Sequence, residues 1–430
     1  MESIWRHTLP AFPPLPGDRK TGVLIIGGGM AGLLCALRLT QEGTDCVLVE
    51  ANRLCGGVTG NTTAKLTFQH GLIYARLLRE FGPERARLYL EANRNALARF
   101  RELCRDIECD FQERDAYVYA AEDRRKLDRE LEALGRLGFP AEFVRTPDLP
   151  FPTAGAVKFP KQAQFHPLKF AAAIAGGLPI YEHTKVLELA PNRAVTDCGT
   201  VTAENIIVAT HFPMLNKHGA YFLKLYQHRS YVLALENAPE LKGMFVDENK
   251  TGLSLRNHRG YLLLGGGGHR TGKSGGGWRE LEEAAKTFFP GARESARWAA
   301  QDCMTLDGMP YVGRYSLGTK DLYVATGFNK WGMTASMAAA ELLADLIAGR
   351  ENPCEELFSP ARSVLRPQLA VNVGESVLGL LTPAVPRCPH MGCALKYNAQ
   401  EHSWDCPCHG SRFGEDGTLL DNPAADDKRM

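Results

Sequence analysis

The pattern of apolar and polar positions near the start of the chain predicts a β-strand, a helix and a second β-strand in succession. Residues 22–50, GVLIIGGGMAGLLCALRLTQEGTDCVLVE, contain an apolar strand, a glycine turn, an amphipathic helix and another apolar strand that ends in an acidic residue. The apolar run from Val23 to Leu39 is interrupted by three consecutive glycines and is too short to cross a bilayer. We therefore expect a buried βαβ unit and no membrane insertion.

The rest of the chain departs from a strict alternation of strands and helices. A helical period covers residues 77–104 and 122–137, and a strand-like segment at 111–120 separates them. Short strand-like runs follow at 185–189, 205–210, 231–235, 261–265 and 322–326. Glycine and proline spacing then predicts a glycine-dense loop at 265–277, a helix at 333–347 and a connector at 351–386. A second, mixed α/β domain interleaved with the first is the expected arrangement.

Composition and charge narrow the class of protein. A chain of 430 residues is longer than the length that one hydrophobic core usually accommodates, so two or three domains are expected. Lys and Arg total 50 against 49 for Asp and Glu, which leaves no net field to attract nucleic acid. The first twenty residues hold no apolar stretch of signal-peptide length, which predicts a cytoplasmic protein. Eight of the twelve cysteines are scattered and four lie together near the C-terminus, where they indicate metal chemistry.

The glycine turn has the spacing of a dinucleotide-binding site. Gly27, Gly29 and Gly32 give G-x-G-x-x-G between a predicted strand and a predicted helix. The helix N-terminus then faces the phosphates, and Glu50, at the end of the next strand, can accept hydrogen bonds from ribose hydroxyls. The pattern by itself does not separate FAD from NAD.

Four segments favour FAD, because together they resemble one family. The N-terminal glycine segment, RLCGGVTGNTTAKLT at 53–67, LDGMPYVGR at 306–314 and LYVATGFNKWGMT at 322–334 are similar to the FAD-dependent amine and amino acid oxidases, the group that contains D-amino acid oxidase and glycine oxidase. The resemblance covers roughly residues 20 to 350 and is weakest in the middle.

The resemblance implies a set of FAD contacts. Val186 would lie at the adenine, Ala209 near the dinucleotide, and the loop from Thr62 to Lys65 along the isoalloxazine. A helix that begins at Met333 would point its positive end toward the flavin. The remaining residues that we expect to contact FAD are Met30, Ala31, Thr63, Ala64, Gly327, Gly332 and Thr334.

A second motif near the C-terminus predicts an iron-sulfur cluster. Cys388 and His390 form a C-x-H pair, and Cys406 and His409 form a C-x-x-H pair. Two thiolates on one iron and two imidazoles on the other define a Rieske-type 2Fe-2S centre. The alternative is a structural zinc site, since two cysteines and two histidines can also hold zinc.

The two loops resemble Rieske ferredoxins and the iron-sulfur subunit of quinol-oxidising complexes, and the segment that begins at Asp421 is similar to the proline loop of that family. The resemblance implies that Cys388, His390, Cys406 and His409 are the ligands, and that Cys393 and Cys408 are the pair that forms a disulfide in some members. The module is short for this fold. Either the connector supplies missing strands or the oxidoreductase body shields the cluster.

Substrate-binding groups are less clearly marked. Arg229 and Tyr231 open a strand that could face the flavin, and an arginine fork suits a substrate carboxylate. Trp331 could form a wall of the site or a route toward the cluster, and core packing is an equal alternative. Lys65 and Lys330 are the cations nearest the flavin by motif position, and both could simply be solvated.

These inferences together predict an α/β fold with a Rossmann-like FAD domain, an interleaved mixed α/β substrate domain and a short all-β Rieske-type module. The expected segments are an N-terminal extension at 1–20, the FAD domain at 21–76, 155–215 and 300–350, the cap domain at 77–154 and 216–299, a connector at 351–384 and the Rieske module at 385–430.

The predicted activity is oxidation of a small amine or amino-acid-like substrate by FAD, with electrons passed to the cluster and then to an external redox partner. One alternative is an ordinary amine or amino acid oxidase whose C-terminal module is structural or senses redox state. Another is a flavin and iron-sulfur electron carrier that docks redox proteins and oxidises no small molecule.

Overall fold

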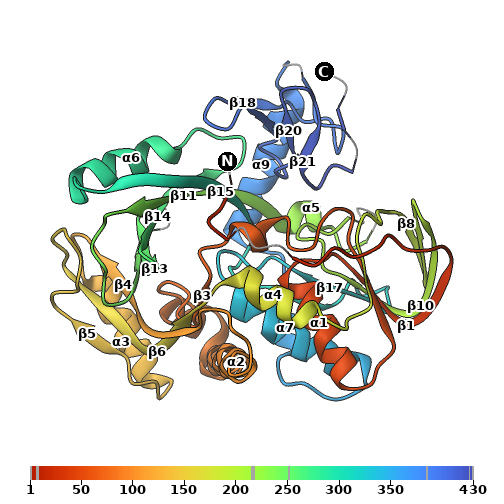
Figure 1. Cartoon of the computed structure of the whole chain (residues 1–430), viewed down its shortest axis with the longest axis horizontal. Helices are drawn as coiled ribbons and strands as arrows, with labels where there is room; N and C mark the ends of the chain where they lie inside the picture. Colours follow the sequence, from red (N-terminus) through yellow and green to blue (C-terminus); the bar gives the residue numbers. More distant parts are fainter. Residues whose placement is uncertain are drawn as a thin grey trace.

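The computed structural model describes residues 2–5, 9–214, 218–249, 252–383, 386–425 and 427–428. The elements of these segments form two large sheets and one small sheet (Figure 1). The predicted boundaries at 215–216 and 384–385 lie outside the described residues. The predicted mixed α/β fold with a small all-β module is confirmed.

The first sheet contains the predicted βαβ unit. Its order is β16-β17-β10-β1-β2-β7, and β1 pairs in parallel with both β10 and β2. Strands β1 and β2 end in fully buried apolar runs, as expected for a parallel sheet covered on both faces. The strands are β1 (Arg19–Ile26), β2 (Cys46–Val49), β7 (Ile180–Tyr181), β8 (Val186–Ala190), β9 (Arg193–Thr196), β10 (Gly199–Val208), β16 (Tyr311–Arg314) and β17 (Leu322–Thr326).

The second sheet is mainly antiparallel. Its order is β15-β11-β14-β13-β12-β4-β6-β3, with β5 added beside β6. The strands are β3 (Lys65–Leu66), β4 (Gln112–Ala120), β5 (Glu142–Val144), β6 (Gly155–Gln164), β11 (Leu225–Glu236), β12 (Met244–Asp247), β13 (Ser254–His258), β14 (Tyr261–Arg270) and β15 (Arg293–Thr305). Strand β6 and the end of β15 belong to this sheet, whereas the predicted segments 155–215 and 300–350 assign them to the FAD domain.

The glycine-dense segment is only partly a loop, so the predicted loop at 265–277 is wrong in its first half. Strand β14 continues through four glycines to Arg270. Gly266 and Gly267 have φ values of 157° and 59°, and the register with β11 shifts at this point. Glycine tolerates such angles, so the segment forms a β-bulge and stays within the sheet.

The segment expected to be a connector contains two helices, α8 (Glu355–Phe358) and α9 (Pro367–Leu381). Pro367 stands at the first turn of α9, where a missing N–H costs nothing, and no further proline follows until Pro383. The small sheet comes next, in the order β18 (Lys396–Asn398), β19 (Ser403–Asp405), β20 (Arg412–Gly414) and β21 (Leu419–Asp421).

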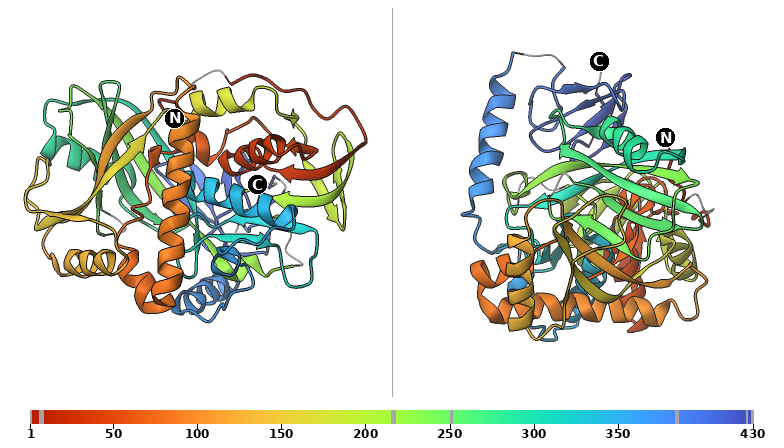
Figure 2. Two further views of the ribbon diagram at one scale, coloured as in Figure 1. Left: turned by 90° about the horizontal axis from the view of Figure 1, so that it is seen from below. Right: turned by 90° about the vertical axis from the view of Figure 1, so that its left-hand side faces the viewer.

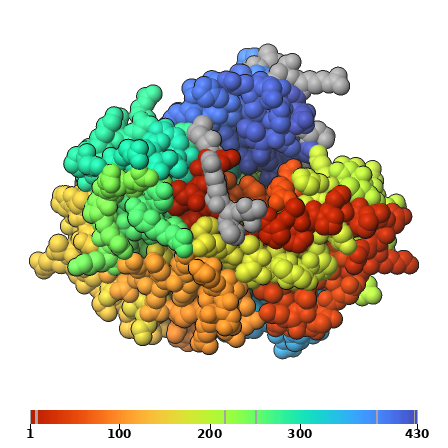
Figure 3. Space-filling model, in the orientation of Figure 1, coloured from red at the N-terminus to blue at the C-terminus, as the bar shows by residue number. Residues whose placement is uncertain are grey.

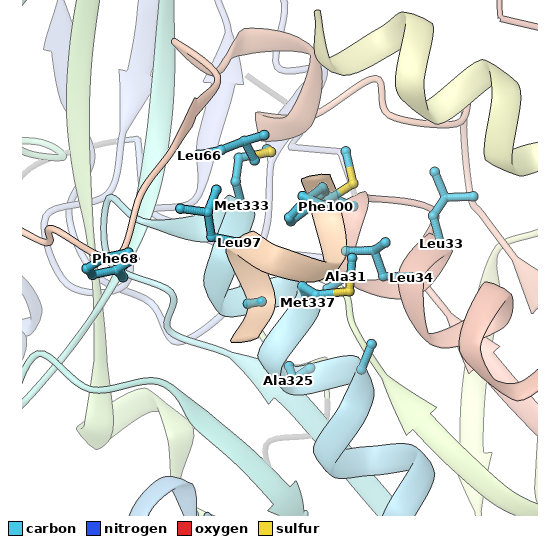
Figure 4. Close-up of a cluster of buried hydrophobic side chains, with 14 of the residues drawn as sticks. Ala31, Leu33, Leu34, Leu66, Phe68, Leu97, Phe100, Ala325, Met333 and Met337 are labelled. Atoms are coloured by element: carbon cyan, nitrogen blue, oxygen red, sulfur yellow. The ribbon is translucent and has the colours of Figure 1, made fainter. Parts of the chain in front are cut away.

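Helices cover the first sheet and join it to the second. Figure 4 shows apolar side chains of α1, α2 and α7, among them Leu34, Phe100 and Met337, gathered in one core. Helix α2 bends at Gly82, where φ is 81°, just before Pro83. The remaining helical segments and their bounds are α1 (Met30–Gln41), a 3₁₀ turn (Val58–Asn61), α2 (Tyr74–Leu103), α3 (Arg125–Arg136), α4 (Pro167–Ala175), α5 (Tyr221–Lys224), α6 (Gly277–Phe288) and α7 (Gly332–Ile347).

The C-terminal module rests on the two large sheets together. Figure 3 shows it seated between the α6 region and the N-terminal half of the chain, and Figure 2 shows α9 standing along its flank. In the described residues, no helix has both the length and the apolar character needed to span a bilayer.

Candidate functional site

The glycine turn between β1 and α1 brings three segments into contact. Gly27 has a φ of 110°, and a Cβ placed there would lie 2.6 Å from the carbonyl oxygen of Ala209. A Cβ on Gly32 would lie 1.9 Å from the carbonyl oxygen of Gly27, so helix and strand meet backbone to backbone. Gly29 precedes the first residue of α1, Met30, whose N–H donates to Thr59 Oγ1 at 3.0 Å. The turn therefore has the close approach that a dinucleotide pyrophosphate needs.

Glu50 lies at the end of β2, directly beside this turn. Its Oε2 accepts a hydrogen bond from Gly28 N at 2.7 Å, and its Oε1 accepts one from Asn52 N at 2.9 Å. The carboxylate is half-buried and each oxygen has one further lone-pair direction. It holds the glycine turn in place, and its predicted contact with a ribose remains a prediction.

The residues predicted near adenine and dinucleotide lie at the same edge of the first sheet. Ala209 follows β10, is buried, and donates from its N–H to Ile26 O at 2.8 Å. Val186 begins β8 and is buried two residues after Thr184, whose N–H donates to Glu50 O at 2.9 Å. The fold thus collects Gly27, Glu50, Val186 and Ala209 from distant parts of the chain.

The loop predicted along the isoalloxazine meets the start of α7. Ala64 is fully buried with a φ of 53°, and its N–H donates to Thr62 Oγ1 at 3.0 Å. Thr334, in the first turn of α7, donates from Oγ1 to Thr67 O at 2.8 Å. Gly327, with a φ of 69°, ends the strand that leads into this helix. The positive end of α7 therefore faces the segment that follows Thr62, Thr63 and Ala64.

Trp331 stacks on His70 beside the same helix start. The two rings are 5.0 Å apart with an interplanar angle of 18°. His70 is buried and contacts Tyr89 OH at 2.7 Å through Nδ1, and burial lowers the pKa of His70 to about 3. Trp331 is half-buried, and its predicted place as a wall of the site stays a prediction. Lys330 is exposed, and its charge lowers the pKa of half-buried Asp302 against the larger, opposite effect of desolvation.

The sequence reasoning missed Arg256, a fully buried cation of β13. Its Nη1 donates to Ala64 O at 2.7 Å, whereas Nε and Nη2 are buried and have no hydrogen-bond partner in the described part of the chain. Trp5, from the N-terminal extension, covers the guanidinium with its ring at 5.3 Å. The sequence offers only a weak signal for Arg256, because its strand, Ser-Leu-Arg-Asn-His, is mostly polar.

Lys65 gives this site a second cation. Its Nζ donates to Ser254 Oγ at 2.5 Å. Burial lowers the pKa of Lys65 to about 7, helped by the Arg256 charge, and burial lowers the pKa of Arg256 to about 9, with Arg114 adding to it. An unpaired buried charge is costly, and the hydrogen bonds of these two side chains include no carboxylate among the described residues. Together, Lys65 and Arg256 suit an anionic group.

Arg229 and Tyr231 lie elsewhere, at the contact with the C-terminal module. Glu401 accepts hydrogen bonds from Arg229 Nε at 3.0 Å, from Arg229 Nη2, and from Tyr231 OH at 2.9 Å. A guanidinium bound in this bidentate way is not available to a substrate carboxylate. The structure gives their predicted substrate role no support.

Two loops of the small sheet bring the predicted cluster ligands together. Cys388 and Cys406 each start a tight turn: Gly392 N donates to Cys388 O and Gly410 N to Cys406 O, both at 2.9 Å. The rings of His390 and His409 lie edge to face, with centroids 5.0 Å apart and an interplanar angle of 86°.

Three cysteines of these loops lie close together: the sulfurs of Cys393, Cys406 and Cys408 are within 4.8 Å of one another. Cys393 and Cys408 are free thiols here, so their predicted disulfide stays a prediction about the oxidised protein.

The donor set fits a Rieske cluster. All four cysteines of the loops are buried thiols, and the two ring nitrogens of His409 are buried without a well-aligned hydrogen bond in the described chain. Burial lowers the pKa of His409 to about 3, with His390 and Arg270 adding to it. Neutral imidazoles and paired thiolates are what the two irons of such a centre require.

The two cluster loops are covered by the oxidoreductase body on one side and by α9 on the other. This contact shows how the short module protects its predicted cluster. Phe212 meets the His390 ring at 6.4 Å and Phe222 meets the His409 ring at 6.2 Å. On the other side, a Cβ on Gly379 of α9 would lie 2.6 Å from Cys408 Sγ. The segment before the motif thus supplies a helix and not the missing strands.

Comparison with known proteins identifies both parts. Residues 22–346 match the family model of FAD dependent oxidoreductases, and residues 367–429 match that of the Rieske [2Fe-2S] domain. The chain is 34% identical to YhfW of Bacillus subtilis (strain 168), named as a Rieske 2Fe-2S iron-sulfur protein, over 98% of this chain and 96% of YhfW. It is 25% identical to gamma-glutamylputrescine oxidoreductase of Escherichia coli (strain K12), over 79% of this chain and 86% of that protein.

Solved structures share the fold of the larger part. Glycine oxidase from Geobacillus kaustophilus aligns with a TM-score of 0.67 at 23% identity, over 80% of this chain and 99% of the oxidase. L-proline dehydrogenase from P. horikoshii aligns with a TM-score of 0.67 at 17% identity, over 81% of this chain and 98% of the dehydrogenase. The predicted cofactors, FAD and a 2Fe-2S cluster, are those of the two matched domains. The chain therefore belongs to the FAD dependent oxidoreductase family and carries a C-terminal Rieske [2Fe-2S] domain.

Proposed function

We propose that the protein is a dehydrogenase that oxidises the C–N bond of a small amine or amino-acid-like substrate and delivers the electrons through the Rieske centre to a separate redox protein. One observation carries the proposal. Ala209 touches the glycine turn, and Phe212, three residues later, touches the ring of His390. Three residues span at most about 11 Å, so the dinucleotide site and the cluster site are neighbours.

FAD, when bound, supplies a two-electron acceptor for C–N oxidation, and the 2Fe-2S cluster supplies a one-electron acceptor. The residues that would hold FAD are those of the glycine turn, Glu50, the Thr62–Lys65 loop and the start of α7. Cys388, His390, Cys406 and His409 would hold the cluster. A dehydrogenase is favoured over an oxidase because a neighbouring one-electron acceptor competes with oxygen for the electrons.

The cation pair supports a substrate that carries a carboxylate. Arg256 has two unpartnered N–H-bearing nitrogens, and a guanidinium fork suits a carboxylate in two parallel hydrogen bonds. Trp5 excludes water from one side, since it is fully buried and its Nε1 donates to Thr62 O at 2.6 Å. The names of glycine oxidase and L-proline dehydrogenase also point to amino-acid substrates.

The first test is a low-temperature electron paramagnetic resonance spectrum of the anaerobically purified, chemically reduced protein. A Rieske-type signal is expected. A colourless module that holds zinc would remove the electron-transfer part and leave a flavin enzyme with a structural tail.

The second test is a panel of small amines and amino acids added under anaerobic conditions, with flavin bleaching as the readout. Bleaching followed by the cluster signal supports the proposal, and rapid peroxide formation in air at full turnover would show an oxidase instead. If no small molecule bleaches the flavin but a reductase protein does, the chain is an electron carrier.

A further inference from the structure

We propose that Gln227 and His211 form the contact through which electrons pass between the two cofactor sites, an inference that rests on the proposed function. Gln227 is a buried residue of β11. It packs on Gly410, next to the ligand His409, so closely that a Cβ there would lie 2.2 Å from Gln227 Cγ. Its Oε1 accepts a hydrogen bond from Nε2 of His211 at 3.1 Å. The cluster loop is thus joined to the segment that follows β10.

The other end of this contact reaches the dinucleotide site through the backbone. His211 is two residues beyond Ala209, whose carbonyl abuts Gly27. The carbonyl of His211 accepts a hydrogen bond from Thr326 Oγ1 at 2.5 Å, and Thr326 is followed by Gly327, a predicted flavin contact. His211 therefore lies between the ends of β10 and β17, the two strands that border the predicted FAD site.

The module fixes the segment on both sides of His211. Asn422 donates from Nδ2 to Thr210 O at 2.8 Å and to Phe212 O at 3.1 Å. His211 itself has a φ of 66°, which is uncommon for a residue other than glycine and is maintained only where surrounding contacts hold it. Contacts of this kind keep the distance between two sites constant, which an electron-transfer route requires.

The electron balance needs no group beyond those already named. Oxidation of the substrate breaks one C–H bond and one N–H bond, turns the C–N bond into C=N, and releases two electrons and two protons. FAD, when bound, would accept both electrons, and a cluster held by Cys388, His390, Cys406 and His409 would pass them singly to a one-electron redox protein. The protons leave to solvent.

Gln301 provides a matched control. It is another buried glutamine at the same loop, and its Nε2 donates to Gly410 O at 2.9 Å. Its Oε1 accepts a hydrogen bond from Thr271 Oγ1 at 2.9 Å, whereas Oε1 of Gln227 accepts from His211. Gln301→Leu removes a hydrogen bond to Gly410 O. Gln227→Leu keeps the Cβ and Cγ that pack on Gly410 and removes the amide oxygen that accepts from His211, so only this variant interrupts the connection to the dinucleotide site.

The experiment uses the anaerobic holoprotein and a light-activated deazaflavin as the reductant. Flavin and cluster absorbance are followed after a flash, and the resonance spectrum and iron content of each variant are recorded. We expect Gln227→Leu to slow reduction of the cluster by the flavin about tenfold, with spectrum and iron content unchanged, and Gln301→Leu to match the wild type. An unchanged rate in Gln227→Leu, or an equal loss in both variants, would overturn the route.

Two further outcomes are distinguishable. If the wild-type flavin never reduces the cluster, the proposed function itself fails. If Gln227→Leu loses iron, His211→Asn decides, because asparagine tolerates the left-handed backbone and is too short to reach Gln227. The same tenfold loss is expected there, and a wild-type rate in that variant would reject the route.

Discussion

Glu401 of the C-terminal module and Arg229 of strand β11 form a buried ion pair that joins two segments 172 positions apart. The side chains of Arg229 and Glu401 are 4% and 8% exposed. Arg412, from the module itself, donates from Nη2 to the same carboxylate at 2.8 Å. Glu401 therefore lies between two guanidinium groups, one from each side of the interface.

Glu401→Gln should loosen the module from the body. Removing one charge of a buried pair costs up to about 3–5 kcal/mol. Asp421 offsets part of this cost, because its Oδ2 lies 3.7 Å from Arg229 Nη1 and 3.0 Å from Arg412 Nη1. We expect the cluster absorbance to be lost at a lower temperature than the flavin signal, and limited proteolysis to cut the chain before α9. Glu415→Gln is the control, since that side chain is 59% exposed and in the same module. Equal behaviour of the two variants would contradict a role for Glu401 in docking.

The glycine turn and the cluster loops could be predicted from the sequence, because the structure of each depends on residues that are close together in the chain. The spacing of Gly27, Gly29 and Gly32 sets a turn whose geometry follows from the missing side chains, and the structure shows the backbone contacts it requires. The predicted ligands Cys388, His390, Cys406 and His409 lie in two tight turns that each span only a few residues. Such features form wherever the rest of the chain permits.

Features that depend on distant partners were not predictable. Arg229 has the strand position of a substrate-binding residue, and only the folded chain shows that Glu401 neutralises it. Arg256 is the reverse case, because its burial without an acidic partner appears only when Trp5 and Ala64 close over it. The glycines after Leu264 were predicted to form a loop. They form a β-bulge instead, and a bulge can be recognised only from the pairing of β14 with β11.

Binding of a carboxylate should weaken as pH rises above about 7. Burial and the Arg256 charge lower the pKa of Lys65 to about 7, so its ammonium is present below this pH and lost above it. A bound anion favours the protonated amine, and affinity should then fall by up to about tenfold per pH unit above 7. Titration of the flavin absorbance with acetate between pH 6 and 8 measures this, a range that stays below the pKa of about 9 of Arg256. Lys65→Met should bind weakly with no such slope; a slope that persists there would assign the titration to another group.

Gly32→Ala should impair FAD binding and leave the cluster intact. The new Cβ would lie 1.9 Å from Gly27 O, so the turn must open where the pyrophosphate is expected. Overpacking of this kind costs about 1–3 kcal/mol, which corresponds to a loss of affinity of about 5- to 160-fold. Flavin content after dialysis is the measurement. Gly135→Ala in α3 is the control, because no atom lies within 4 Å of its added Cβ, and it should retain full flavin.

Ser411→Ala should lower the reduction potential of the cluster. The Ser411 hydroxyl hydrogen-bonds to Cys388, a predicted ligand, while its oxygen accepts from Ala424 N at 3.0 Å. A hydrogen bond to a ligand sulfur stabilises the more negative, reduced cluster and so raises the potential. One such bond contributes about 1.4 kcal/mol, which is ~60 mV for a one-electron couple. A redox titration followed by the resonance signal measures the shift.

Ser403→Ala is the control, because Ser403 is equally buried in the module but donates to Asp405 Oδ1 at 2.9 Å. A potential that falls equally in both variants would mean that the module's stability, and not the sulfur hydrogen bond, sets the value.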